Sequence, residues 1–522
     1  MKANLATQLL VVGGGATGLG VAWDASLRGI KTVLIEQSDL GQGTSGRYHG
    51  LLHSGGRYVI SDPQSARECA QENQILRQIA PSTIEPTGGF FLSTPADPSD
   101  FSDEWLAAAQ SLGLPVEELT ISQALNLEPK INPKIKRAFA VEDASLDSFD
   151  LLHDLAASIR EAGGEVWLRH KLEALEISNS GVTGAVIRDL TTGRKFTLGV
   201  EAVVNAAGPW AAKVAQLAEI DLPIALGKGV MVALAMRPIQ HVLNRCKPPA
   251  DGDIIVPVGT VAVVGTTDVE VEEPTSLQME PWEIDLILAE GDILVPGILN
   301  QRPLRAWAGI RPLYQPRSST TADTRTMTRA HIIIDHGADH DCKGLFSVFG
   351  GKLTTFRLMA QETVDVVSQY FGVQAECSTA TTALIPADSK RFYQLSERPS
   401  KVASIEAEQP AQQVLCECEL VTYADVERML AIDPDASLDD LRRDLRLGMG
   451  PCQGGFCSYR AAGLAHRLNP TAPQPYYLTN FLHERWKGIK PLAWGNNLRQ
   501  MELSRRIYQG IFAVDTVGVD RA

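Results

Sequence analysis

The strongest constraint on the fold of this chain is a glycine turn close to its N-terminus. In QLLVVGGGATGLGVAWDASLRGIKTVLIE, residues 8–36, Gly13, Gly15 and Gly18 separate an apolar strand from an Ala-rich helix, and a second strand ends at Glu36. Such glycines allow a tight turn, close approach of a pyrophosphate and close helix packing, and the acid accepts hydrogen bonds from ribose hydroxyls. The segment predicts a dinucleotide-binding βαβ unit, but it does not distinguish FAD from NAD.

Three later stretches of small residues favour FAD. Residues 38–58 (SDLGQGTSGRYHGLLHSGGRY) would line a flavin with backbone amides, 203–211 (VVNAAGPWA) form a buried-type strand and turn, and 349–360 (FGGKLTTFRLMA) form a glycine turn that opens a helix. Each stretch alone is more often a packing turn. Together they predict cofactor contacts from Gly13, Gly15, Gly18, Glu36, Thr44, Ser45, Ala207, Gly208, Trp210, Gly350, Gly351, Leu353 and Thr354.

Four of the eight cysteines form two pairs far from this turn. They are Cys416 and Cys418 in VLCECEL, and Cys452 and Cys457 in GMGPCQGGFCSYR. Four thiolates complete either a 2Fe-2S cluster or a tetrahedral zinc site, and the one-residue gap of the first pair is tight for zinc, so the spacing favours the cluster. Glycines around the second pair would let backbone amides reach the sulfurs. A disulfide is the plain alternative, but nothing in the sequence is secretory.

Length and charge limit the remaining possibilities. At 522 residues the chain is too long for one core, and its hydrophobic content of 44% is that of an ordinary globular protein. A net charge of −14 argues against a nucleic-acid partner, and an anionic substrate would need a local cationic pocket. We see no apolar run of membrane-spanning length, no cleavable leader and no lipidation signal, so we expect a cytoplasmic protein whose membrane contacts come through partners.

The motifs together resemble a known family. The glycine turn, HSGGRY at 53–58, GTTD at 265–268, GIRPL at 309–313 and GGKLTTFR at 350–357 look like the FAD-dependent glycerol-3-phosphate dehydrogenases, within the wider D-amino-acid-oxidase-like flavoproteins. The cysteine pairs resemble the small 2Fe-2S domain of the bacterioferritin-associated-ferredoxin type. This order of domains, with FLHERWKGIKPLAWG near the C-terminus, is typical of catalytic subunits from the anaerobic branch of the family.

The resemblance implies an α/β fold in three parts. We expect a Rossmann-like, two-dinucleotide-binding FAD domain of the glutathione-reductase or D-amino-acid-oxidase type, a strand-rich substrate domain and a small helical 2Fe-2S domain. The oxidoreductase part would span 1–385, with FAD segments at about 1–80, 145–220 and 330–385 and substrate segments at about 81–144 and 221–329. A polar linker at 386–411, the 2Fe-2S domain at 412–465 and a tail at 466–522 would follow.

The resemblance also implies the reaction and its residues. The chain would oxidise sn-glycerol 3-phosphate to dihydroxyacetone phosphate by hydride transfer to flavin N5, and a phosphate substrate requires Arg or Lys. Electrons would pass through the cluster to a flavin-bearing B-type subunit, which carries FMN, then to a membrane-associated iron-sulfur C-type subunit, with quinone as the final acceptor. The catalytic candidates are Arg57, Tyr58, Thr267, Arg311, Arg329, Lys352 and His53.

Several points stay open at the level of sequence. Arginine is a poor base, so His53, His49, Tyr58 or water would accept the hydroxyl proton. KGVMVA at 228–233 lacks the histidine that aerobic relatives carry soon after KG, and we expect no covalent link to the flavin. Two other functions compete, a flavin-dependent amine or amino-acid dehydrogenase and a non-catalytic metal-binding scaffold.

Overall fold

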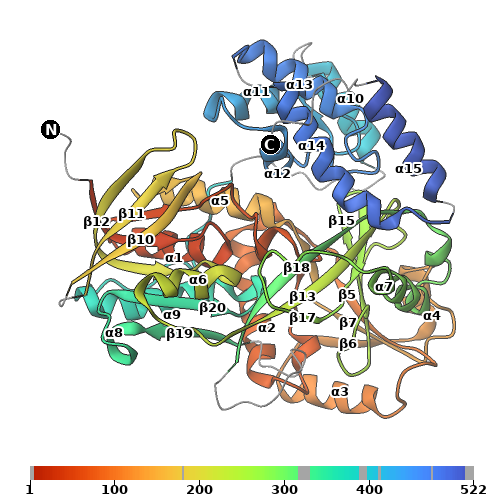
Figure 1. Ribbon diagram of the computed structural model, residues 1–522. Helices are drawn as coiled ribbons and strands as arrows, with labels where there is room; N and C mark the ends of the chain where they lie inside the picture. Colours follow the sequence, from red (N-terminus) through yellow and green to blue (C-terminus); the bar gives the residue numbers. More distant parts are fainter. Residues whose placement is uncertain are drawn as a thin grey trace.

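The N-terminal glycine turn lies at the end of an inner strand of a mixed sheet (Figure 1). The computed structural model describes residues 5–178, 181–315, 330–386, 397–408, 413–471, 474–495 and 497–511. Strand β1 (Ala6–Val12) pairs in parallel with β2 (Thr32–Ile35) and β12 (Lys195–Asn205). Two more strands pair in parallel, β9 (Glu165–Trp167) with β2 and β20 (Leu345–Gly350) with β12. The antiparallel strands are β11 (Gly181–Asp189), which pairs with β12, β10 (His170–Ser178), which pairs with β11, and β19 (His331–Asp335), which pairs with β20.

Helix α1 (Ala16–Leu27) is buried over most of its length. It lies between α5 (Ser148–Glu161) and α9 (Phe356–Phe371), so Trp23 is 1% exposed. Small residues allow this contact, because a Cβ on Gly20 would come 3.0 Å from the Cβ of Ala360. A helix buried on all sides is typical of a core position, and the expected Rossmann-like α/β domain is confirmed.

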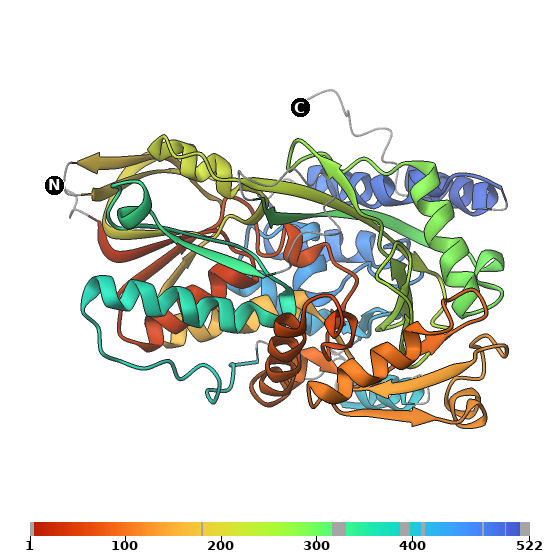
Figure 2. The same cartoon turned by 90° about the horizontal axis from the view of Figure 1, so that it is seen from below.

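The second sheet is mostly antiparallel and is the expected strand-rich part (Figure 2). Its longest pair joins β13 (Ile224–Leu234) to β18 (Pro303–Tyr314), and an apolar core lies between the sheet and α7 (Pro281–Leu294). The other strands are β17 (Val269–Val271), β16 (Val261–Gly265), β15 (Ile254–Val258), β14 (Val242–Arg245), β5 (Gly89–Ser93), β7 (Arg137–Val141) and β6 (Val116–Leu119).

Shorter elements connect and cover the two large sheets. A three-stranded sheet consists of β3 (Leu51–Leu52), β8 (Ala144–Leu146) and β4 (Ile84–Glu85), with β8 in the middle. The remaining helices of this part are α2 (Pro63–Ile79), α3 (Phe101–Ser111), α4 (Ile121–Leu127), α6 (Ala211–Ala215) and α8 (His336–Asp339).

The C-terminal part is helical and carries the two cysteine pairs. Hairpin β21 (Val414–Cys416) and β22 (Val421–Thr422) packs with α11 (Tyr423–Ile432), α12 (Leu438–Leu445), α13 (Cys457–Leu468) and α14 (Gln474–Ile489), and α15 (Asn497–Arg506) follows. The segment expected to be a linker contains helix α10 (Arg398–Glu408), while residues 387–396 and 409–412 lie outside the described residues. Within the described ranges, no helix combines the length and apolarity needed to cross a bilayer.

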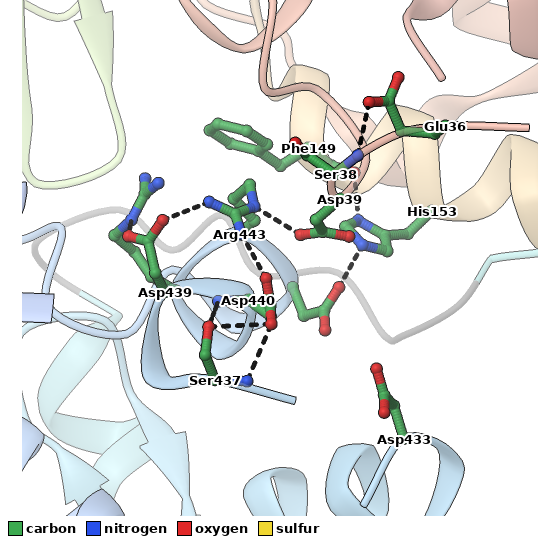
Figure 3. A network of polar contacts seen from close by, with 12 residues as sticks. Glu36, Ser38, Asp39, Phe149, His153, Asp433, Ser437, Asp439, Asp440 and Arg443 are labelled. Atoms are coloured by element: carbon green, nitrogen blue, oxygen red, sulfur yellow. Dashed lines mark hydrogen bonds and ion pairs between the residues drawn. The ribbon is translucent and has the colours of Figure 1, made fainter. Parts of the chain in front are cut away.

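Buried ion pairs hold this helical part against the first sheet. Arg443 on α12 is 1% exposed, and its guanidinium contacts Asp39, Asp439 and Asp440, each at 2.5 Å (Figure 3). Asp39 belongs to the loop after β2, so this contact joins distant parts of the chain. Arg446 adds a second link, since it donates to Asp147 at 2.6 Å. Removing one partner of a buried pair typically costs about 3–5 kcal/mol, so these contacts fix the position of α12.

We predict that the junction weakens at alkaline pH. His153 on α5 is ion-paired with Asp444 of α12, and although burial opposes protonation, Asp444 and Asp39 raise the pKa of His153 to about 9. A histidine whose pKa is raised in the folded state stabilises that state fully at pH values below its ordinary pKa near 6.5. This contribution to the free energy of unfolding, about 3 kcal/mol at most, disappears as the pH rises through 9. Amide hydrogen exchange of α12, corrected for the intrinsic effect of pH, should therefore quicken between about pH 6.5 and 9.5.

The variant His153→Gln should flatten this pH dependence, because glutamine does not titrate. His466→Gln, on an exposed face of α13, is the matched control. Equal pH slopes in wild type and His153→Gln would contradict the assignment.

Candidate active site

A large cavity lies between the two sheets, and nearly all of the expected cofactor and substrate residues line it. Its volume is about 1960 Å³, and its lining runs from the N-terminal glycine turn to the end of β18. Among the predicted site residues, the cavity wall includes Gly13, Gly15, Glu36, Thr44, Ser45, His53, Arg57, Tyr58, Ala207, Gly208, Trp210, Thr267, Arg311, Gly350, Gly351, Lys352, Leu353 and Thr354. A space of this size accommodates a dinucleotide together with a small substrate.

The glycine turn forms one end of the cavity. Gly13 has φ of +120°, and a Cβ there would come 2.6 Å from the carbonyl oxygen of Ala206. Gly15 is the N-cap of α1 and provides no side-chain cap, although Ser45 Oγ accepts from Ala16 N at 3.0 Å. The N–H groups at a helix N-terminus attract phosphate oxygens. Gly18 does not line the cavity, and its role is packing, since a Cβ there would collide with the carbonyl oxygen of Gly13.

Glu36 lies beside this turn, directly after β2. Its carboxylate accepts from Gly14 N at 2.8 Å and from Ser38 N at 2.9 Å. Burial raises the pKa of Glu36, and these two N–H groups oppose the rise. Each carboxylate oxygen keeps a further lone-pair direction, so the side chain remains an acceptor for hydroxyl groups.

Three cations line the other end of the cavity, and each is held by contacts of its own. Arg57 donates to Asp253 at 2.8 Å, and Lys352 Nζ donates to Ser65 Oγ at 2.9 Å and lies 4.6 Å from the ring centroid of Tyr58. Arg311, on β18, donates to Thr266 Oγ1 at 2.6 Å and lies 3.1 Å from Asp268. These contacts orient the cations before any anion binds.

Two neutral histidines lie among these cations. Burial lowers the pKa of His49 to about 3, with Arg57 and Arg311 adding to the effect, and burial, His49, Arg57 and Lys352 lower the pKa of His53 well below its usual value. Nδ1 of His49 accepts from Leu51 N at 3.2 Å, so the hydrogen-bond pattern assigns its proton to Nε2. The His53 ring lies 5.4 Å from that of Tyr58, between centroids.

Some predicted residues have other contacts than expected. Thr267 is fully buried, and its hydroxyl donates to Glu283 at 2.9 Å, which in turn pairs with Lys228. Thr267 lines the cavity, and its backbone carbonyl accepts a hydrogen bond from Arg311 at 3.2 Å, so its buried side chain also supports the turn that holds Arg311. Arg329 lies outside the described residues. Two residues that hold the cations, Ser65 and Asp253, are not among the predicted site residues, because nothing in their local sequence marks them. The other two, Thr266 and Asp268, lie in the GTTD motif at 265–268.

The four paired cysteines come together in the helical part. The sulfurs of Cys416 and Cys418 are 3.8 Å apart, as are those of Cys418 and Cys452, and Cys457 adjoins both Cys416 and Cys452. All eight cysteines are free thiols, so the disulfide alternative is wrong. Neighbouring thiols and the N–H of Gly448 lower the pKa of Cys416, and Gly454 N–H acts similarly on the pKa of Cys452. In the described ranges, no group of three or more His, Cys, Asp or Glu is arranged so that it could hold a metal ion.

The fold and the cavity define a flavoprotein-like oxidoreductase, and comparison with known proteins agrees. The model of the family "FAD dependent oxidoreductase" matches residues 8–366. The A-type subunit of the anaerobic glycerol-3-phosphate dehydrogenase of Escherichia coli K12 is 37% identical over 98% of this chain and 97% of its own, and that of Haemophilus influenzae is 34% identical over 98% and 94%. The structure of the Bacillus halodurans glycerol-3-phosphate dehydrogenase complexed with FAD matches 99% of this chain and 95% of that one, with TM-score 0.61 and 22% identity.

The chain therefore belongs to the FAD dependent oxidoreductase family, and within it to the group of A-type subunits of anaerobic glycerol-3-phosphate dehydrogenases. It is a flavin-dependent oxidoreductase. The donor set fits the cofactor, because the glycine turn, the uncapped start of α1 and the Glu36 carboxylate offer what the phosphates and ribose of FAD require.

We predict that Gly18→Ala abolishes FAD retention. The added methyl would collide with the Gly13 carbonyl, so the turn must open, at a cost of about 2 kcal/mol or more in unfolding free energy. The measurement is the flavin-to-protein ratio after purification, together with thermal unfolding. Gly199→Ala in β12 is the control, because its Cβ would meet nothing closer than 3.6 Å. A variant at Gly18 that keeps a full complement of FAD would refute the packing role.

Proposed function

We propose that this chain oxidises sn-glycerol 3-phosphate to dihydroxyacetone phosphate and passes the electrons through a 2Fe-2S cluster to partner subunits and quinone. The observation that carries the proposal is the convergence of Arg57, Arg311 and Lys352 on the wall of one cavity that also carries the cofactor motifs. The relatives named above are glycerol-3-phosphate dehydrogenase subunits that match this chain over almost their full length.

Charge supports a phosphate substrate. The three cations adjoin two neutral histidines, and they can donate charge-assisted hydrogen bonds to a phosphate monoester, although Asp253 and Asp268 already offset part of the charge of Arg57 and Arg311. Lys352 and Arg57 are assigned to the phosphate. Arg311 is assigned to the reacting hydroxyl, because a guanidinium stays protonated and stabilises a developing alkoxide.

His53 is the proton acceptor in this proposal. His49 offers an N–H at Nε2, since its Nδ1 already accepts a hydrogen bond from Leu51. His53 is neutral at physiological pH and lies among the same cations, so the negative charge of a bound phosphate would raise its basicity. FAD, when bound, supplies the hydride acceptor. The protein's own residues orient the substrate, hold the hydroxyl and remove its proton.

The cysteines support the cluster. Four thiols converge in the helical part, and a two-iron cluster takes four thiolates as its ligands. Cys416, Cys418, Cys452 and Cys457 would hold it. Gly450 must be glycine, since a Cβ there would come 2.6 Å from the sulfur of Cys418.

Partner subunits would receive the electrons beside the cysteines. Phe456 and Tyr459 flank Cys457 and are 62% and 53% exposed, and large exposed apolar side chains of this kind mark interaction surfaces. A B-type subunit with FMN and a membrane-associated iron-sulfur C-type subunit would carry electrons to quinone. The chain would then lie in the cytoplasm, at the inner face of the cell membrane, through these partners.

We predict that glycerol 3-phosphate bleaches the flavin absorption of the anaerobically purified chain, whereas amines and amino acids do not. Lys352→Met should raise the substrate concentration for half-maximal bleaching about tenfold or more, because a charge-assisted contact to phosphate is lost. Lys134→Met, an exposed lysine outside the cavity, is the control. Bleaching by an amino acid instead of glycerol 3-phosphate would overturn the substrate assignment.

A second prediction separates the cluster from the flavin. Cys418→Ser should lose iron and the cluster absorption but keep substrate-dependent flavin bleaching, while electron transfer to the partner subunits falls. Cys377→Ser is the control, since Cys377 is a free thiol whose sulfur contacts Thr379 at 3.0 Å. Stoichiometric zinc in the wild-type chain would refute the cluster.

A further inference from the structure

A group of arginines at the junction between the two parts of the molecule belongs to neither the cation end of the cavity nor the cysteines. Arg305 lies on β18, Arg442 on α12 and Arg485 on α14, and Arg47 belongs to the loop that lines the cavity and lines it as well. Each of Arg47, Arg305 and Arg485 lies within electrostatic range of at least one other arginine of the group. We call these four residues the junction arginines.

The junction arginines carry buried donors without acceptors. Arg485 is 2% exposed, and within the described residues its Nε and Nη2 have no hydrogen-bond partner, nor does the enclosed Nη1 of Arg305. The aromatic ring of Phe481 covers Arg485, with 5.6 Å from Cζ to the ring centroid. A buried guanidinium N–H without an acceptor is unfavourable, and in a native protein it indicates a bound ion or ordered water.

Nearby carboxylates are already engaged. Asp439 faces Arg305 and Arg485, but it pairs with Arg442 at 2.7 Å and with Arg443 at 2.5 Å, and Figure 3 shows it beside Arg443. Glu484 pairs with Lys487 at 2.5 Å. Burial, with Arg442 and Arg47 nearby, lowers the pKa of Arg305 to about 9, so this side chain is still charged at neutral pH.

The surrounding backbone leaves room for these side chains. Arg305 passes beneath α14 at Gly488, where a Cβ would come 2.6 Å from its Cγ and 2.7 Å from its Nε. Glycine inside a helix is less favourable than alanine, so a contact that only glycine permits is consistent with a specific place for Arg305.

We propose that Arg305, Arg442 and Arg485, with Arg47 beside them, form a second anion site that takes a phosphate dianion, free or as a monoester. Guanidinium groups from three elements suit a tetrahedral anion with several acceptor oxygens, because each fork can donate two hydrogen bonds. Bound there, the anion would bridge β18 to α12 and α14 and would stabilise the junction. The site does not depend on the proposed reaction.

The test uses the full-length, FAD-loaded chain. Lys352→Met serves as the background, because the proposed function predicts that it weakens phosphate binding in the active cavity. Inorganic phosphate, compared with chloride at equal ionic strength, should raise the melting temperature of this background. Adding Arg485→Met should weaken the phosphate affinity about tenfold or more, whereas adding Arg467→Met, an exposed arginine of α13, should leave it unchanged.

A second variant covers the case in which Arg485→Met does not fold. Arg305→Gln, whose side chain is only partly buried, gives the same comparison. Glycerol 2-phosphate tests whether the site takes free phosphate or a phosphate monoester. Binding equal to that of inorganic phosphate indicates a monoester site, and binding of inorganic phosphate alone indicates a site for the free ion. No stabilisation beyond chloride, or equal stabilisation in all variants, would show that water satisfies these donors and would overturn the proposal.

Discussion

The contact between Asp39 and Arg443 connects the two functional parts of this molecule. Asp39 follows the strand that leads to Glu36, and Arg443 lies on the helix whose C-terminus leads into the second cysteine pair. Both side chains are buried, so their contact is less screened by salt than a surface pair would be. The loop beside the nucleotide turn therefore fixes where α12, and with it the cysteine cluster, can lie.

Charge is distributed unevenly between surface and interior. The net charge is −14, yet buried or partly buried cations concentrate in the cavity and at the junction. An acidic surface repels anionic substrates, so these interior cations must provide the local attraction. The neutral state of His49 and His53 follows from the same arrangement, because burial and neighbouring cations both disfavour an imidazolium.

The sequence predicted best what depends on local backbone. The glycine turn, the strands around 253–269 and the convergence of the cysteine pairs follow from spacing and residue type, and the structure contains all three. The sequence could not predict which side chains far apart in the chain contact one another. Asp253 lies 196 residues from Arg57, and Glu283 holds Thr267 from a different element, so the contacts that orient the cations depend on the tertiary fold. Thr267 shows the consequence, since the sequence marks it as a motif position but does not reveal that its hydroxyl is held by Glu283.

A continuous series of contacts links the cavity to the cysteines. Tyr48 lines the cavity, and its hydroxyl donates to the carbonyl of Leu146, whose neighbour Asp147 accepts from Arg446. Arg446 also donates to Glu419, the residue after Cys418, at 2.9 Å. Each member of this series is held by a hydrogen bond, an ion pair or a peptide bond. The position of the cysteines relative to the cavity is thus set by the native packing.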